Sequence, residues 1–139
     1  MKIAIRYYTQ TKLGNTKKIA DRLSDALEVP ALPVSEKLNE DVDVLFLLDA
    51  MYANDVNKAI KEFLKEPGAK IGTIYNICSS CSGRSTAKKI RKLGSKLGLN
   101  ISEKDYACHG QWLGLMKGHP TEEELQGAVD FAKKALEQE

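Results

Sequence analysis

Five apolar residues in a row, Val44–Leu48, limit what this chain can fold into more than any other feature of its sequence. A strand with one face in water alternates apolar and polar residues, whereas a parallel strand covered on both faces is apolar throughout. The run is also shorter than most helices, and turn residues flank it. It therefore predicts a strand inside a parallel sheet that has helices packed on both of its faces.

The rest of the chain alternates short β-rich runs with longer segments whose apolar residues recur at helical spacing. Strands are predicted at 2–8, 31–32, 41–48, 71–78 and 101–108, and helices at 15–27, 56–66, 87–97 and 121–136. The last strand is the most polar, which places it at an edge, and Pro30 and Pro33 place the second strand at an edge as well. Strands that alternate with helices predict an α/β fold with a doubly wound sheet and a central first strand.

Composition narrows the possible classes of function. The 139 residues fit a single domain, 1–139, and 21 basic against 19 acidic residues leave a charge too balanced to suggest nucleic-acid binding. No apolar run is long enough to cross a membrane, and the first residues enter a strand directly, without the pattern of a signal peptide. Three cysteines without framework spacing fit a reducing compartment, so we expect a cytoplasmic protein.

The segment Thr9–Thr16 links the first predicted strand to the first predicted helix. The first backbone N–H groups of a helix have no partner within it, and the aligned peptide dipoles make that end positive. Gly14 allows a close approach of the backbone, and the threonines at 9, 11 and 16 offer hydroxyls. The segment therefore predicts a binding site for a phosphate group.

Within this segment, Thr11-x-x-Gly14-Asn15-Thr16 resembles the phosphate loop of flavodoxins, usually [Ser/Thr]-x-Thr-Gly-Asn-Thr. Leu13 stands where that loop has its middle threonine, and the loop is about two residues longer than usual. Either Thr9 or Thr11 therefore takes the place of the family's first hydroxyl. Lys12 is an added cation, either a partner of the phosphate or a solvated loop lysine.

The C-terminal part of the chain carries a second resemblance to the same family. Cys108-His109-Gly110 is similar to the Cys-x-Gly that ends the last strand, and 118–125 is similar to the Gly-His-Pro-[Thr/Asn]-Glu-Glu-[Asp/Glu]-Leu that opens the last helix. Thr121 and Glu124 have the spacing of a capping box, which gives His119 and Pro120 a structural role. The resemblance implies a short-chain, flavodoxin-like three-layer α/β/α sandwich with a five-stranded parallel sheet in the order 2-1-3-4-5.

The resemblance also implies the cofactor FMN and a role in electron transfer, as a carrier or as a small flavin-dependent reductase. Whether the protein is an enzyme stays open, and its redox partner protein is unknown. The balanced charge departs from the acidic surface typical of carrier flavodoxins. The expected phosphate contacts are Thr9, Gln10, Thr11, Lys12, Gly14, Asn15 and Thr16. The expected ring contacts are Met51, Tyr52 and Ala53, with Tyr52 stacked on the flavin, and Cys78, Ser79, Ser80, Cys81 and Gly83 in a loop spanning 78–85.

Two alternatives give Cys78 a chemical role. Cys78-x5-Arg84-Ser85 fits the signature loop of cysteine-dependent phosphatases, in which a thiolate attacks and an arginine binds the phosphate. Cys78-x-x-Cys81 can also be a dithiol, with Cys108 as a third sulfur near the flavin.

A further alternative is a fold that has lost its cofactor and serves as an interaction module. The apolar residues in the loop before the last helix either cover the flavin or pack against a second copy of the chain as a homodimer. They are Trp112, Leu113, Leu115 and Met116.

Overall fold

The computed structural model describes residues 1–10, 14–51, 55–111 and 115–139. Its five parallel strands form one sheet in the order β2-β1-β3-β4-β5, which confirms the predicted fold class and strand order. The strands are β1 (Ile3–Tyr7), β2 (Ala31–Pro33), β3 (Val42–Ala50), β4 (Ile71–Ser80) and β5 (Tyr106–His109). The helices are α1 (Asn15–Leu27), α2 (Lys58–Lys65), α3 (Ala87–Leu97) and α4 (Glu122–Glu137).

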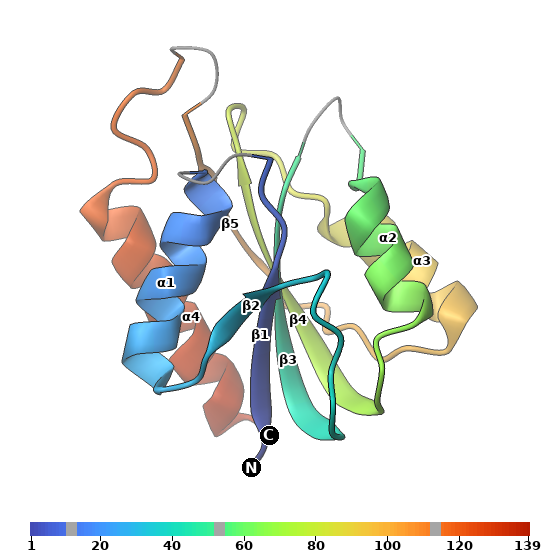
Figure 1. Ribbon diagram of the computed structural model, residues 1–139. Helices are drawn as coiled ribbons and strands as arrows, with labels where there is room; N and C mark the ends of the chain where they lie inside the picture. The colour runs from blue at the N-terminus through green and yellow to red at the C-terminus, as the bar shows by residue number, and fades with distance from the viewer. Residues whose placement is uncertain (11–13, 52–54, 112–114) are drawn as a thin grey trace.

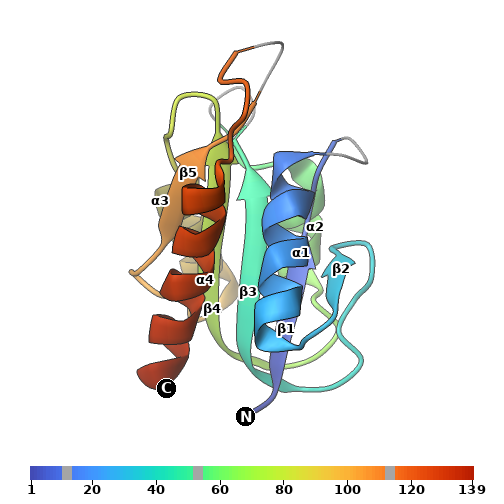
Figure 2. The same cartoon turned by 90° about the vertical axis from the view of Figure 1, so that its left-hand side faces the viewer.

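The helices form two layers, with α1 and α4 on one face of the sheet and α2 and α3 on the other (Figures 1 and 2). The apolar run of β3 is divided between two hydrophobic cores. Phe46 packs in the core that includes residues of α1 and α4, while Leu45 and Leu47 pack in the core that includes residues of α2 and α3. All five residues of the run are fully buried, as a strand covered on both faces requires. No helix within the described residues is both long and apolar enough to span a membrane.

Two strand boundaries differ from the sequence expectation. A strand is predicted over 101–108, but β5 begins only at Tyr106. Ile101 forms an isolated bridge to Ile74 instead. Between them the backbone amide of Lys104 donates a hydrogen bond to the hydroxyl of Ser102. This bond closes a local turn that competes with strand pairing. The expected loop 78–85 begins later, because β4 continues to Ser80 in register with β3 and β5.

The connection from β2 to β3, residues 34–41, crosses the sheet without a helix. The buried side chain of Arg6, in β1, forms hydrogen bonds with the backbone of this link. Its guanidinium donates to the backbone carbonyl oxygens of Glu36 at 2.6 Å and Lys37 at 3.4 Å. One arginine therefore satisfies backbone groups that a helix would have satisfied internally.

Two glycines at positive φ give a matched test of the packing around this link. Gly68 has φ of 100°, and a Cβ there would lie 2.4 Å from the carbonyl oxygen of Leu38. Gly98 ends α3 with φ of 73°, and a Cβ there would meet nothing within 4 Å. Gly68→Ala should therefore lower the free energy of unfolding by about 3 kcal/mol, against about 1 kcal/mol for Gly98→Ala. Urea denaturation measures both, and equal losses would contradict the close packing at Gly68.

Candidate functional site

The carboxyl ends of the parallel strands meet at one edge of the sheet, at the top in Figure 1, away from the two chain termini. Segments that follow β1, β3, β4 and β5 come together along this edge. In an open parallel sheet, ligands bind beyond this edge, where the strand order reverses on either side of the first strand. Here the reversal lies between β1 and β3.

The start of α1 has neither a side-chain cap nor an acidic residue in its first turn. Gly14 occupies the N-cap in an extended conformation, and it has no side chain with which to cap the helix. The first turn contains no acidic residue, so nothing in it neutralises the positive end of the helix dipole. The side-chain amide of Asn15 donates to the carbonyl oxygen of Gln111 at 2.8 Å. Within the part of the chain that the structure describes, no side chain caps the leading N–H groups of α1, so they are available to an external acceptor.

Thr9 supplies a second feature at the same place. Its Oγ1 is buried and has no hydrogen-bond partner among the described residues, although buried hydroxyls are nearly always paired. Gln10 beside it is exposed. The hydroxyl of Thr16 was expected to face a phosphate. In the structure its side chain is buried, and its Oγ1 lies 3.5 Å from Oγ of Ser79 in β4. Thr11 and Lys12 lie outside the described residues.

The segment after β3 is described only in part. Met51 is partly buried, and its amide donates to the carbonyl oxygen of Ser79 at 3.1 Å, which continues the pairing of β3 with β4. The expected ring contacts Tyr52 and Ala53 lie outside the described residues.

The segment after β4 turns back on itself and packs against β5. Oγ of Ser80 donates to the carbonyl oxygen of Arg84 at 2.8 Å, which closes the turn. Gly83 has φ of 77°, and a Cβ there would lie 2.9 Å from Nε2 of His109. The side chains of Cys78 and Ser79 are fully buried within β4, and Ser80 is buried as well, whereas Cys81 and Gly83 are partly exposed.

A buried polar cluster lies beneath this turn, and it was not predicted from the sequence. The Asp49 carboxylate, at 0% exposure, accepts hydrogen bonds from Oγ1 of Thr86 at 2.6 Å and Nδ2 of Asn76 at 3.0 Å. Burial raises the pKa of the Asp49 carboxyl above its ordinary value, and the hydrogen bonds from Thr86 and Asn76 oppose this only in part. The cluster ties the ends of β3 and β4 to the start of α3.

The burial of Cys78 contradicts its predicted role as a phosphatase nucleophile. Burial, and then the neighbouring Asp49 carboxylate, raise the pKa of the Cys78 thiol far above its ordinary value, so the thiol is protonated at neutral pH. Its Sγ lies 3.9 Å from the carbonyl oxygen of Arg84, and the Arg84 side chain is exposed. A phosphatase needs the opposite arrangement, an accessible thiolate beside a guanidinium.

The three sulfurs also do not converge. In the pairing of β4 with β5, Cys78 is opposite Ala107 and Ser79 is opposite Cys108. Successive side chains of a strand point to opposite faces, so Cys78 and Cys108 lie on different faces of the sheet. Burial raises the pKa of the Cys108 thiol to about 12.

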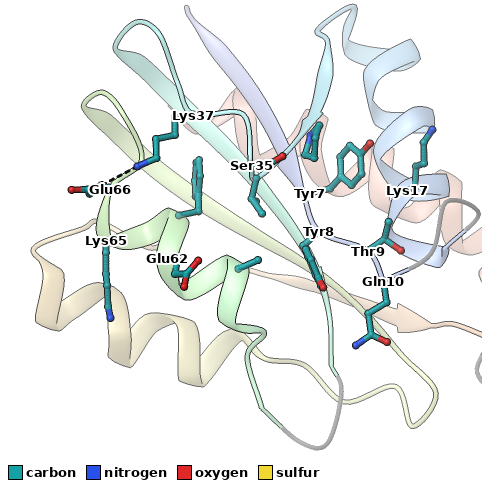
Figure 3. Close-up of a pocket in the computed structure, with 14 residues that line it drawn as sticks. Tyr7, Tyr8, Thr9, Gln10, Lys17, Ser35, Lys37, Glu62, Lys65 and Glu66 are labelled. Carbon is teal, nitrogen blue, oxygen red and sulfur yellow. Dashed lines mark hydrogen bonds and ion pairs between the residues drawn. The ribbon is translucent and has the colours of Figure 1, made fainter.

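A hollow of about 1140 Å³ lies between α2 and the β2–β3 link, where that crossover has no helix. Figure 3 shows that it extends from Lys37 and Lys65 at one end to Thr9 and Gln10 at the other. Tyr8 and Phe63 line it with apolar surface, and Lys37 forms an ion pair with Glu66 at 3.0 Å on its rim. The hollow reaches the carboxyl-end edge of the sheet at the segment after β1, where Tyr8, Thr9 and Gln10 line it.

No protein-family model matches the chain, and no curated protein matches it by sequence. Solved structures do match. Oxidised Flavodoxin 2 from Bacillus cereus has 16% identity and a TM-score of 0.72, with 100% of both chains covered. A short-chain flavodoxin associated with a PDU bacterial microcompartment has 16% identity and a TM-score of 0.71, with 99% of both chains covered. A flavodoxin from the domain Archaea has 16% identity and a TM-score of 0.66, covering 98% of this chain and 99% of its own. The chain therefore has the flavodoxin fold.

Proposed function

We propose that residues 1–139 form a single flavodoxin-like domain that binds FMN without a covalent bond and takes part in cytoplasmic electron transfer. The proposal rests first on one observation: the Oγ1 of Thr9, in the segment that leads to the uncapped start of α1, is buried without a partner among the described residues. A phosphate oxygen placed there would accept from the leading N–H groups and from the threonine hydroxyl together. The similarity of the fold to flavodoxins over nearly the whole chain supports FMN as the source of that phosphate.

We assign the remaining roles from the position of each segment in the chain and, where the structure describes the residue, from its burial. Gly14, Asn15 and Thr16 contribute backbone N–H groups to the phosphate, and Gln10, Thr11 and Lys12 complete the loop. The side chains of Cys78 and Ser79 are buried in β4, so we assign them to holding the strand in place. We assign Cys81 and Gly83, with the buried Ser80 behind them, to one side of the ring, and Met51, Tyr52 and Ala53 to the other.

When bound, FMN supplies one- or two-electron chemistry, while the protein orients the ring and tunes its reduction potential through stacking and hydrogen bonds. The balanced charge of the chain, +2, favours a partner that recognises shape and apolar surface over one steered by strong charge. The function requires a protein that donates or accepts the electrons. Leu115, at 55% exposure, offers apolar surface for such a partner or for a second copy of the chain.

A titration with FMN and with riboflavin tests the proposal. Binding to a protein quenches flavin fluorescence when the ring stacks on an aromatic side chain, so the titration gives a dissociation constant for each ligand. We expect FMN to bind more tightly than riboflavin, because only FMN carries a phosphate. Absence of quenching with both flavins would overturn the proposal and leave a cofactor-free interaction module.

The substitution Thr9→Val tests the observation that carries the proposal. Valine has the shape of threonine without the hydroxyl, so the affinity for FMN should fall about fivefold, the value of one hydrogen bond, while the affinity for riboflavin should not change. The free energy of unfolding without ligand should stay the same or rise, because no described residue pairs with the hydroxyl. A fully retained FMN affinity would show that Thr9 does not contact the phosphate.

A further inference from the structure

Three side chains that could bind a metal ion join the end of β5 to the start of α4. One ligand atom from each of His109, His119 and Glu124 lies within 4.8 Å of the other two. Nδ1 of His119 is 2.5 Å from Oε1 of Glu124, and Nδ1 of His109 is 3.7 Å from Oε2 of the same carboxylate. Each imidazole thus faces a different oxygen of one carboxylate.

The carboxylate between the two imidazoles is held in a fixed position. Glu124 belongs to the capping box of α4, and its Oε1 accepts from the backbone amide of Thr121 at 2.9 Å. Its Oε2 accepts from the backbone amide of His109, also at 2.9 Å. Each carboxylate oxygen has two acceptor positions. Oε2 therefore keeps one position for a cation, whereas Oε1 also forms a hydrogen bond with Nδ1 of His119, which a cation bound to Oε1 would replace.

The capping function alone does not explain the imidazoles. The capping box is complete with Thr121 and Glu124, without either histidine. The 3.7 Å between Nδ1 of His109 and the carboxylate is too long for a hydrogen bond. The two rings meet edge to face with centroids 5.6 Å apart, and both side chains are partly exposed, so ions from solvent can reach them.

We propose that His109, His119 and Glu124 bind a divalent transition metal ion, with Zn²⁺ as the best match. Two imidazoles and one carboxylate suit Zn²⁺, which takes nitrogen and oxygen ligands at about 2.0–2.2 Å in a tetrahedron and leaves its fourth position to water. In such a tetrahedron one carboxylate oxygen lies about 3.3 Å from each imidazole nitrogen, so the two rings must turn from different oxygens of Glu124 toward the same one. Rotations of partly exposed side chains supply these movements. Mg²⁺ and Ca²⁺ fit poorly because they prefer sites made of oxygen ligands.

The proposed site does not depend on the flavin proposal. Its ligands lie on β5, on α4 and just before α4, and none of them is assigned to FMN. A bound ion would link the end of β5 to the start of α4 beside Gly83, whose turn packs on the ring of His109. It would therefore fix the part of the sheet edge that lies next to the proposed flavin site.

A titration of the full chain with Co²⁺ and then Zn²⁺ tests the proposal. Co²⁺ in a tetrahedral site gives strong visible absorption, and we expect one equivalent to bind and Zn²⁺ to displace it. The chain has two histidines, so NMR of the imidazole groups reports on the site directly. Both imidazole signals should shift together with one equivalent of Zn²⁺. Failure of either signal to shift, or affinity no better than millimolar, would overturn the proposal.

His109→Gln is the variant of choice because the capping box does not use this side chain. It should weaken Zn²⁺ binding at least tenfold, and Cys81→Ser, which removes the most accessible thiol, should leave binding unchanged. Zn²⁺ binding that survives His109→Gln or is lost with Cys81→Ser would place the ion elsewhere. His119→Gln should give the same loss as His109→Gln, so a variant that fails to fold does not end the test.

Discussion

Replacing Asn15 with aspartate should weaken FMN binding by roughly 10–100-fold while changing the stability of the free protein little. Asn15 is the first residue of α1, and aspartate matches it in shape. The new carboxylate would face a phosphate dianion at short range, and repulsion of about 1.4–2.8 kcal/mol gives this loss of affinity. In the free protein, the favourable interaction of aspartate with the positive end of α1 offsets the lost hydrogen bond to Gln111.

Asn15→Ala is the matched control, because it removes the same hydrogen bond without adding charge. We expect it to weaken FMN binding only a few-fold, and riboflavin binding should be equal for both variants. The difference between the two variants should shrink at high salt, since counterions screen repulsion at a partly exposed site. Equal FMN affinities for Asn15→Asp and Asn15→Ala in low salt would mean that the phosphate does not bind at the start of α1.

Replacing Asp49 with alanine should lower the free energy of unfolding by about 3 kcal/mol. In a fully buried place, the substitution removes the acceptor of the Thr86 hydroxyl and leaves the Asn76 amide with only its longer hydrogen bond to the carbonyl oxygen of Leu47. An unpaired buried polar group costs about 1–3 kcal/mol, and the missing side chain adds a small cavity. Urea denaturation near pH 5 measures the loss, and a change below about 1 kcal/mol would show that the cluster does not stabilise the fold.

The pH dependence gives a second, independent test of Asp49. Its pKa is raised in the folded state, so above the ordinary value near 3.8 the folded protein holds a proton that the unfolded chain has lost. The contribution of Asp49 to stability is therefore fully present below that value, and it is lost as the pH rises toward the folded pKa. Asp49→Asn cannot ionise, so its stability relative to the wild type should increase steadily above about pH 4. A difference between the two proteins that stays constant from pH 4 to pH 8 would contradict a raised pKa.

Local sequence patterns predicted the layers of this fold well. The uninterrupted apolar run of β3 identified a strand covered on both faces, and Thr121 with Glu124 identified the start of α4. Both signals depend on neighbours within a few residues, so they can be recognised without knowledge of the tertiary structure. The edge strand β5 is shorter than predicted, because Ser102 and Lys104 form a local turn.

The candidate site could be predicted less fully because its chemistry depends on which side of the sheet each residue faces. The sequence predicts that the strand ends and the loop begins at Cys78, but pairing with β3 keeps this residue within the strand, opposite Asp49. Asp49 follows an apolar run and Asn76 interrupts another, which are signals of buried polar residues, but nothing local shows that they meet. To predict their contact, or that of His109 with Glu124, one must know the register of neighbouring strands and the position at which a helix begins.

The unequal burial of the three cysteines has a practical consequence. Cys78 and Cys108 are buried on opposite faces, while Cys81 is partly accessible at the turn after β4. An alkylating dye would therefore reach one sulfur well before the other two, without any engineering of the chain. A fluorophore attached there would stand at the rim of the edge where we place the isoalloxazine, so its emission would report in real time on the arrival and departure of small molecules.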